Sequence, residues 1–137
     1  MPRMSPWMIV TVVVACGGPT EPEPRQELGI ISFFHEPVVI TAPESVEAGV
    51  PFEVSVRTYG GGCHSRGTTD VDAIGLRVNV RPYDTHSGHN LCTLPLAMFD
   101  HVAVVTVHEP GNALISFYGA AEPGDSTVVF VREVKVE

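Results

Sequence analysis

The 137-residue sequence is poor in basic residues, with 8 Lys and Arg against 16 Asp and Glu and a formal net charge of −8. Nucleic-acid-binding surfaces need clustered Lys and Arg, which displace counterions from the phosphates. The same shortage removes any attraction to anionic lipid headgroups. The composition therefore argues against nucleic acid as a partner and favours an acidic surface that keeps the protein soluble.

The sequence also lacks the motifs of common enzyme classes. It has no Gly-x-Ser-x-Gly elbow, no His-Glu-x-x-His motif and no glycine-rich phosphate or dinucleotide fingerprint. Glycines 60–62 precede neither a lysine nor a helical pattern, so they are interpreted as a flexible turn. The acidic residues Asp70, Asp72 and Asp84 do not form a regular calcium loop. We therefore predict that the protein is not an enzyme.

The apolar run at residues 7–14 is far shorter than the roughly 20 residues of a membrane-spanning helix. Arg3 is the only charge before it, and small residues follow it. A charged start, a brief apolar stretch and small residues are typical of a secretory signal peptide. Residues 1–15 are therefore predicted to be a leader that is removed on export.

The end of this leader reads Val13-Val14-Ala15-Cys16-Gly17. It resembles the lipobox of bacterial lipoproteins, in which an aliphatic, a variable and a small residue precede an invariant cysteine. The resemblance implies cleavage before Cys16 and a covalent lipid on its thiol. We predict no other cofactor, and a bound metal is the alternative considered below. The resemblance also implies a lipid-anchored protein of the cell envelope. The residue after the cysteine is glycine rather than the aspartate that retains such proteins in the inner membrane, which favours the outer membrane in a two-membrane cell.

Residues 16–28 are rich in proline and glutamate. Proline disrupts helices and sheet ladders, and the charges keep the backbone solvated. The segment is predicted to be an extended tether that reaches roughly 35 Å and holds the following domain off the membrane.

From residue 29 onward the sequence predicts strands only. Short runs rich in Val, Ile, Phe and Thr alternate with polar residues and are separated by Pro and Gly. One predicted hairpin turns at residues 72–75, with Gly75 supplying a positive φ. A bulge is expected near Arg132 and Glu133, where the alternation changes face. The predicted strands lie at residues 30–34, 38–41, 52–56, 69–71, 76–83, 101–107, 113–118 and 127–136.

The segment Ala-Pro-Glu-Ser-Val-Glu-Ala-Gly-Val-Pro-Phe-Glu-Val-Ser-Val at 42–56, followed by Glu-Pro-Gly-Asn-Ala-Leu-Ile at 109–115, resembles bacterial immunoglobulin-like domains. The resemblance implies one antiparallel β-sandwich of seven or eight strands over residues 29–137. Such domains serve adhesion, sensing and structural roles alike, so the resemblance does not specify a function. The Cys-Trp-Cys arrangement of antibody domains is missing, because the single Trp lies in the leader.

With Cys16 assigned to the anchor, Cys63 and Cys92 remain. In an oxidising compartment such a pair indicates a disulfide. The predicted hairpin places Cys63 at its open end, near Asp84, and Cys92 in the loop that leaves the same end. Two reduced thiols or a metal site are the alternatives.

The histidines are the only other hint of chemistry. His64, His86 and His89, with Asp84, are predicted to crowd at this end of the domain, where imidazole and carboxylate groups could bind zinc or copper. Loop spacing and flexible neighbours make solvated loop residues the alternative. The remaining histidines are predicted at edge or surface positions: His35, His101 and His108.

Two functions follow from the sequence. The first is a non-catalytic binding or structural module displayed on a membrane through the lipid on Cys16, with a protein or envelope partner that the sequence does not specify. The alternative is a metal-binding lipoprotein that uses the histidine cluster.

Overall fold

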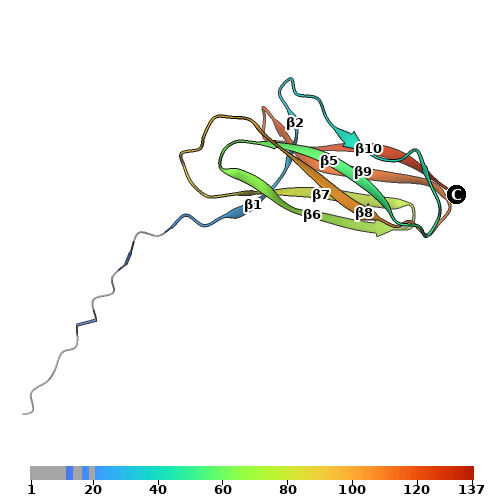
Figure 1. The fold of residues 1–137 in the computed structure, drawn as a ribbon, viewed down its shortest axis with the longest axis horizontal. Helices are drawn as coiled ribbons and strands as arrows, with labels where there is room; N and C mark the ends of the chain where they lie inside the picture. The colour runs from blue at the N-terminus through green and yellow to red at the C-terminus, as the bar shows by residue number, and fades with distance from the viewer. Residues whose placement is uncertain (1–11, 14–16, 19–20) are drawn as a thin grey trace, which may run out of the picture.

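The structure is a computed structural model that describes residues 12–13, 17–18 and 21–137. All its elements are strands, and no helix occurs in this described part of the chain, so the predicted all-β class is confirmed (Figure 1). There are ten strands rather than seven or eight, and the two that were not predicted, at Arg25–Leu28 and Ser45–Val46, have only four and two residues, too few for an alternating pattern to reveal. The strands are β1 (Arg25–Leu28), β2 (Ile30–Phe33), β3 (Ile40–Thr41), β4 (Ser45–Val46), β5 (Phe52–Gly60), β6 (His64–Ile74), β7 (Arg77–His86), β8 (Ala97–Val105), β9 (Gly111–Glu122) and β10 (Ser126–Val136).

The ten strands form one curled sheet that mixes parallel and antiparallel pairs. Antiparallel pairs join β6 to β7, β9 to β10, and β5 to both β3 and β8. Parallel pairs join β9 to β7 and β2, and β10 to β4. The prediction of a purely antiparallel sheet is therefore wrong. Each strand pattern is local, whereas pairing between distant strands is decided by tertiary packing.

The segment of β1 and β2 explains how the sheet curls. β1 pairs with β7, and after Gly29 the chain crosses to β9, where β2 pairs in parallel. The amide of Gly29 donates to the carbonyl of Pro82 in β7, and its carbonyl accepts from the amide of Ala120 in β9, both at 2.8 Å. A side chain at position 29 would collide with Thr58, so this crossing requires glycine.

Strand β1 lies inside the segment 16–28 that the sequence assigns to a tether. Its residues pair with β7 from Arg25 opposite His86 to Leu28 opposite Tyr83. The ordered sheet therefore begins at Arg25, and the length left for a tether is shorter than predicted. Proline and glutamate dominate only as far as Pro24, and β7 offers an open edge to the residues after it.

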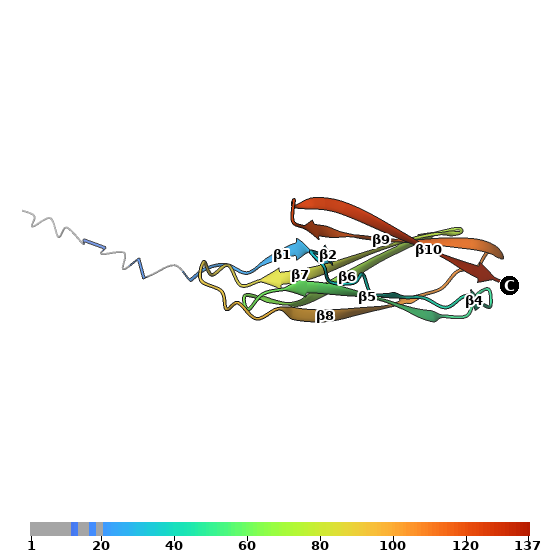
Figure 2. The same cartoon turned by 90° about the horizontal axis from the view of Figure 1, so that it is seen from above.

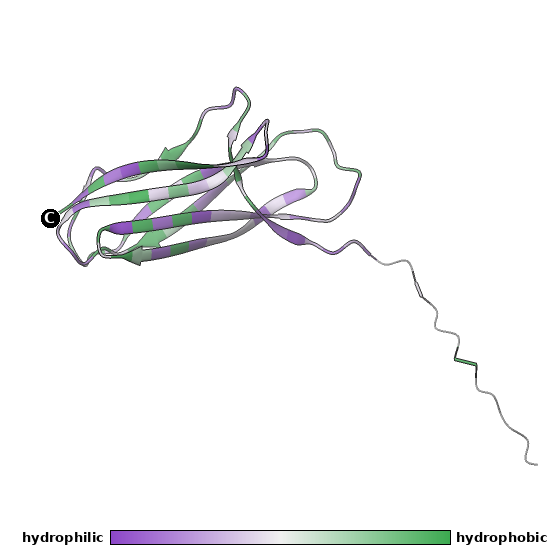
Figure 3. Cartoon of the chain, turned by 180° about the vertical axis from the view of Figure 1, so that it is seen from behind, coloured by the Kyte–Doolittle hydropathy of each residue, from purple (hydrophilic) through white to green (hydrophobic). Residues whose placement is uncertain are grey.

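The core lies inside the curl and follows the predicted alternation. Buried positions recur at every second residue, as expected for strands with one face in the core. Figure 3 shows this as alternating apolar and polar bands along the strands. The fully buried apolar side chains include Val54, Val56, Val78, Val80, Val105, Ile115, Phe117 and Val134.

The β6–β7 hairpin turns through Gly75, whose φ of 57° confirms the predicted positive value. Ile74 pairs with Arg77, so the turn lies slightly later than expected. The register shifts between Arg66 and Thr69, which is a bulge in β6. Because the turn lies later than predicted, Cys63 lies beside Ser87 rather than Asp84, with the Ser87 amide donating to the Cys63 carbonyl at 2.9 Å.

The bulge predicted near Arg132 and Glu133 is absent from β10. Its register with β9 runs without interruption from Ser126 opposite Ala121 to Val136 opposite Gly111. Arg132 takes the inward position between Phe130 and Val134 and remains partly exposed. A long arginine stem can line an apolar edge while its charged end reaches water, so the apparent change of face needs no extra residue.

The two ends of the molecule differ. The N-terminal segment and the loop at residues 87–96 lie at one end, and the C-terminus lies at the other (Figures 1 and 2). In the described residues, no helix has the length and apolar character needed to cross a membrane.

Candidate functional site

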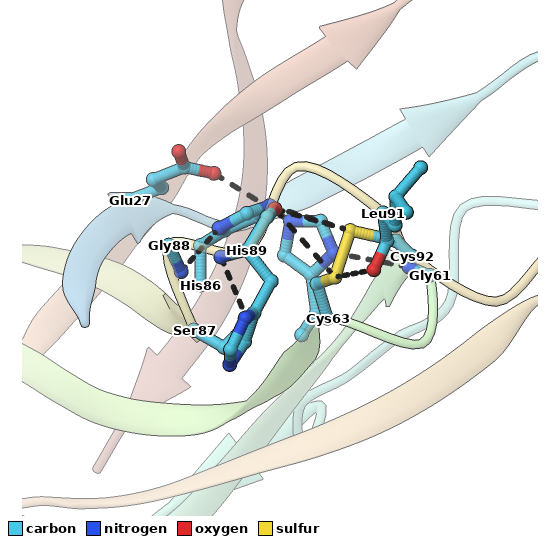
Figure 4. The surroundings of a disulfide bond; sticks show 10 residues. Glu27, Gly61, Cys63, His86, Ser87, Gly88, His89, Leu91 and Cys92 are labelled. Atoms are coloured by element: carbon cyan, nitrogen blue, oxygen red, sulfur yellow. Dashed lines mark hydrogen bonds and ion pairs between the residues drawn. A yellow bond between two sulfur atoms is a disulfide. The ribbon is translucent and has the colours of Figure 1, made fainter. Parts of the chain in front are cut away.

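The predicted disulfide between Cys63 and Cys92 is confirmed, with a Cα–Cα distance of 5.1 Å. It joins the turn before β6 to the loop at 87–96, which we call the clamped loop (Figure 4). Backbone hydrogen bonds flank the bridge on both sides: Ser87 donates to Cys63 at 2.9 Å, and Gly62 donates to Thr93 at 3.1 Å. The bridge and these bonds together restrain the clamped loop.

His64 and His86 lie next to the disulfide and face each other across β6 and β7. Their ring centroids are 4.9 Å apart and the rings are nearly perpendicular. His86 Nε2 lies 3.9 Å from the Cys92 sulfur. The crowding predicted from the sequence is therefore real for these two histidines.

The other two candidate ligands are placed differently. His89 is exposed, and it approaches the bridge with its backbone carbonyl, 3.6 Å from the Cys92 sulfur. Asp84 is buried and its Oδ1 lies 2.8 Å from His101 Nε2. The structure therefore does not bring the four proposed ligands, His64, His86, His89 and Asp84, together around one point.

Backbone amides occupy one nitrogen of each clustered imidazole. Gly61 donates to His64 Nδ1 at 3.0 Å, and Gly88 donates to His86 Nδ1 at 2.9 Å. A nitrogen that accepts a hydrogen bond cannot hold a proton, so each neutral ring carries its hydrogen on Nε2. A metal at Nε2 would move that hydrogen to Nδ1 and break the bond to the amide, which disfavours coordination.

Glu27 of β1 completes the surroundings of His64. Its Oε2 lies 3.5 Å from His64 Nε2, and its Oε1 accepts from Arg25 at 2.7 Å. Burial alone would raise the pKa of Glu27, but the hydrogen bond and charge of Arg25, with smaller effects of His86 and His64, lower that pKa overall. Glu27 is thus held as a carboxylate beside the Nε2–H of His64.

Within the described part of the chain, the tightest group of possible metal ligands is Cys63, His86 and Cys92, whose ligand atoms lie within 4.8 Å of one another. Both sulfurs belong to the disulfide. Because metals bind thiolates, the bridged cysteines offer no strong ligand.

His101 is the residue that sequence reasoning misplaced. It is 1% exposed rather than on an edge or surface, whereas His35 and His108 are exposed as predicted. Its Nδ1 lies 2.8 Å from the hydroxyl of Thr69, and its Nε2 contacts Asp84. His101 lies two and four residues before the buried Ala103 and Val105, so it shares their face of the strand. This alternation could have indicated its burial.

A hollow of about 380 Å³ lies beside His64, between β2, β5 and the clamped loop. Its apolar lining comes from Ile30, Phe33, Leu94 and Leu96, with Glu122 at its polar side. The hollow could accept a small apolar group.

Comparison of the chain with protein-family models, curated proteins and solved structures finds no match. The candidate lipidation residue Cys16 lies outside the described residues.

Proposed function

We propose that this chain is an exported lipoprotein, anchored through a lipid on Cys16, whose all-β domain is a non-catalytic binding or structural module of the cell envelope. The observation that carries the proposal is the Val13-Val14-Ala15-Cys16 pattern after a short apolar run. The ordered sheet begins at Arg25, only nine residues after Cys16, so a short linker would join anchor and domain. In a cell with two membranes, Gly17 favours the outer one.

Two properties of the domain support export. The Cys63–Cys92 bridge is of the kind that persists in oxidising compartments. The net charge of −8 suits a soluble, exposed domain and disfavours binding to nucleic acid. The bridge is a property of the domain alone and is independent of the N-terminal pattern.

The finer fold that we propose is an immunoglobulin-like sandwich. It is supported by the core, which lies between β5 and β8 on one side and β7, β9 and β10 on the other. Such a scaffold presents its loops at the two ends, where binding residues of sandwich domains usually lie. The apolar hollow beside the clamped loop is the site that best suits a ligand or partner.

Metal binding is the second candidate function. It rests on one observation, the contact between His64 and His86 beside the bridge. The accepting role of both Nδ1 atoms opposes it, so we rank it below the binding or structural role.

Fractionation of cells that express the parent chain and Cys16→Ser tests the anchor. The parent should enter the membrane fraction and the detergent-rich phase. Its N-terminal peptide should carry more than one acyl chain, because one chain alone does not anchor a protein stably. Cys16→Ser should stay uncleaved or become soluble. Thr11→Ser, which leaves the pattern intact, is the control. A Cys16→Ser protein that partitions and acylates like the parent would refute the proposal.

A further inference from the structure

The clamped loop exposes two leucines almost completely. Leu91 is 93% exposed and Leu94 is 98% exposed. No Asp, Glu, Lys or Arg occurs in residues 87–96. Apolar side chains that stand free in water, without charged neighbours in the same loop, are typical of an interaction surface.

The loop is restrained although its leucines project. Cys92 lies between the two leucines in sequence and is bonded to Cys63, while the Leu91 carbonyl lies 3.5 Å from the Cys63 sulfur. The Thr93 carbonyl accepts from Gly62. Figure 4 shows Leu91 pointing away from the bridge and its histidines. Because the backbone is already restrained, binding through these side chains orders little additional chain.

The clamped loop lies against the N-terminal segment. A side chain added at Gly88 would meet the carbonyl of Glu23 and the side chain of Pro22. β1 then continues from Arg25 opposite His86. The leucines and the chain that leads to Cys16 therefore share one end of the molecule, and the C-terminus lies at the far end (Figures 1 and 2).

The chain between Cys16 and Glu23 is short. These residues are seven positions apart, and a fully extended chain covers at most about 25 Å over that distance. A lipid on Cys16 would consequently keep this end of the domain close to the membrane surface.

We propose that the clamped loop is a membrane-contacting loop, with Leu91 and Leu94 inserted among the headgroups and upper acyl chains of a zwitterionic phospholipid surface. The inference rests on the proposed anchor at Cys16. Exposed Glu21 and Glu23 beside the loop disfavour anionic headgroups. Each leucine can insert separately into a fluid bilayer, whereas a protein partner would need a matching pocket for each leucine.

Tryptophan fluorescence in the mature, acylated protein tests the insertion. The single natural Trp7 precedes Cys16 and is lost with the leader, so an introduced tryptophan is the only one. Leu94→Trp reports on the loop. Val104→Trp is the matched control, because Val104 is 63% exposed on β8 at the opposite end from the loop. Both variants are reconstituted in phosphatidylcholine vesicles with brominated acyl chains.

We expect blue-shifted Leu94→Trp emission that loses most of its intensity to bromines near the headgroups, with Val104→Trp unaffected. Suppose that mass spectrometry shows an acylated Cys16 but both variants emit like tryptophan in water. This result would overturn the loop proposal and leave the anchor proposal intact. A blue shift without bromine quenching would indicate cover by protein and would also overturn it. An unacylated Cys16 would refute the anchor and, with it, this orientation.

Discussion

His101 is a polar residue in the most buried part of the molecule, and it connects three strands. From β8 it contacts Thr69 of β6 and Asp84 of β7, each at 2.8 Å. β6 and β8 are not paired by backbone hydrogen bonds in the sheet, so these side chains join two edges that the curl brings together. We infer that His101 fixes the closure of the curl.

The substitution His101→Ala should lower the free energy of unfolding by about 3–5 kcal/mol, because it opens a cavity and leaves the buried Asp84 carboxyl without its partner. Urea unfolding followed by circular dichroism measures the loss. His108→Ala, at an exposed histidine, should change stability by less than about 0.5 kcal/mol. If His101→Ala lowers the free energy of unfolding no more than His108→Ala does, the buried contact of His101 with Asp84 contributes no stability.

Metal binding also depends on individual residues, because it depends on single nitrogen atoms of the histidine rings. We expect zinc to shift the ring resonances of His64 and His86 only at roughly millimolar concentration, since coordination would break the hydrogen bonds from Gly61 and Gly88. Histidine NMR spectra of the oxidised protein during a zinc titration provide the measurement. His35 and His108 serve as internal controls. Joint shifts of His64 and His86 at micromolar zinc would favour the metal-binding function instead.

At the scale of elements, the clamped loop depends on its bridge. Two backbone hydrogen bonds join residues 87–96 to the rest of the described chain, and both flank the disulfide. The loop connects β7 to β8, so restraining the loop also restrains the ends of these two strands.

Replacing both Cys63 and Cys92 by Ser should lower the free energy of unfolding by about 3–4 kcal/mol, the chain-entropy effect expected for a sequence separation of 29. It should also increase hydrogen exchange at the Ser87 and Gly62 amides. Denaturant unfolding and hydrogen exchange measure the two effects, with the oxidised parent protein as the reference. Unchanged exchange would mean that the backbone bonds restrain the loop without the disulfide.

Strand β1 illustrates how elements form from sequence and context together. The segment Arg25–Leu28 has no apolar alternation, and its first two residues are exposed. It becomes a strand because β7 is long enough to pair with β9 near its start and with β1 near its end. The pairing also brings Glu27 within 3.5 Å of His64, although the hydrogen bond and charge of Arg25 in the same strand are the main reason that the pKa of this carboxyl is lowered.

At the scale of the whole molecule, the two ends have different chemistry. One end combines the chain leading to Cys16, the disulfide, two histidines and the exposed leucines. The other holds the C-terminus and the short β4–β10 pair. This polarity is what makes the proposed anchor and the proposed membrane contact compatible, because both need the same end to face the bilayer.

The sequence alone determined the all-β class, the alternation of core residues, the positive φ at Gly75 and the Cys63–Cys92 pair. These features depend on local chemistry or, for the cysteines, on their even number in a domain that was taken to be exported. Only the tertiary structure decided the parallel pairing of β9, the strand at Arg25–Leu28 and the contacts of His101 with Thr69 and Asp84. Each of these depends on which distant strand lies alongside, and a pattern within one strand contains no information about its neighbour.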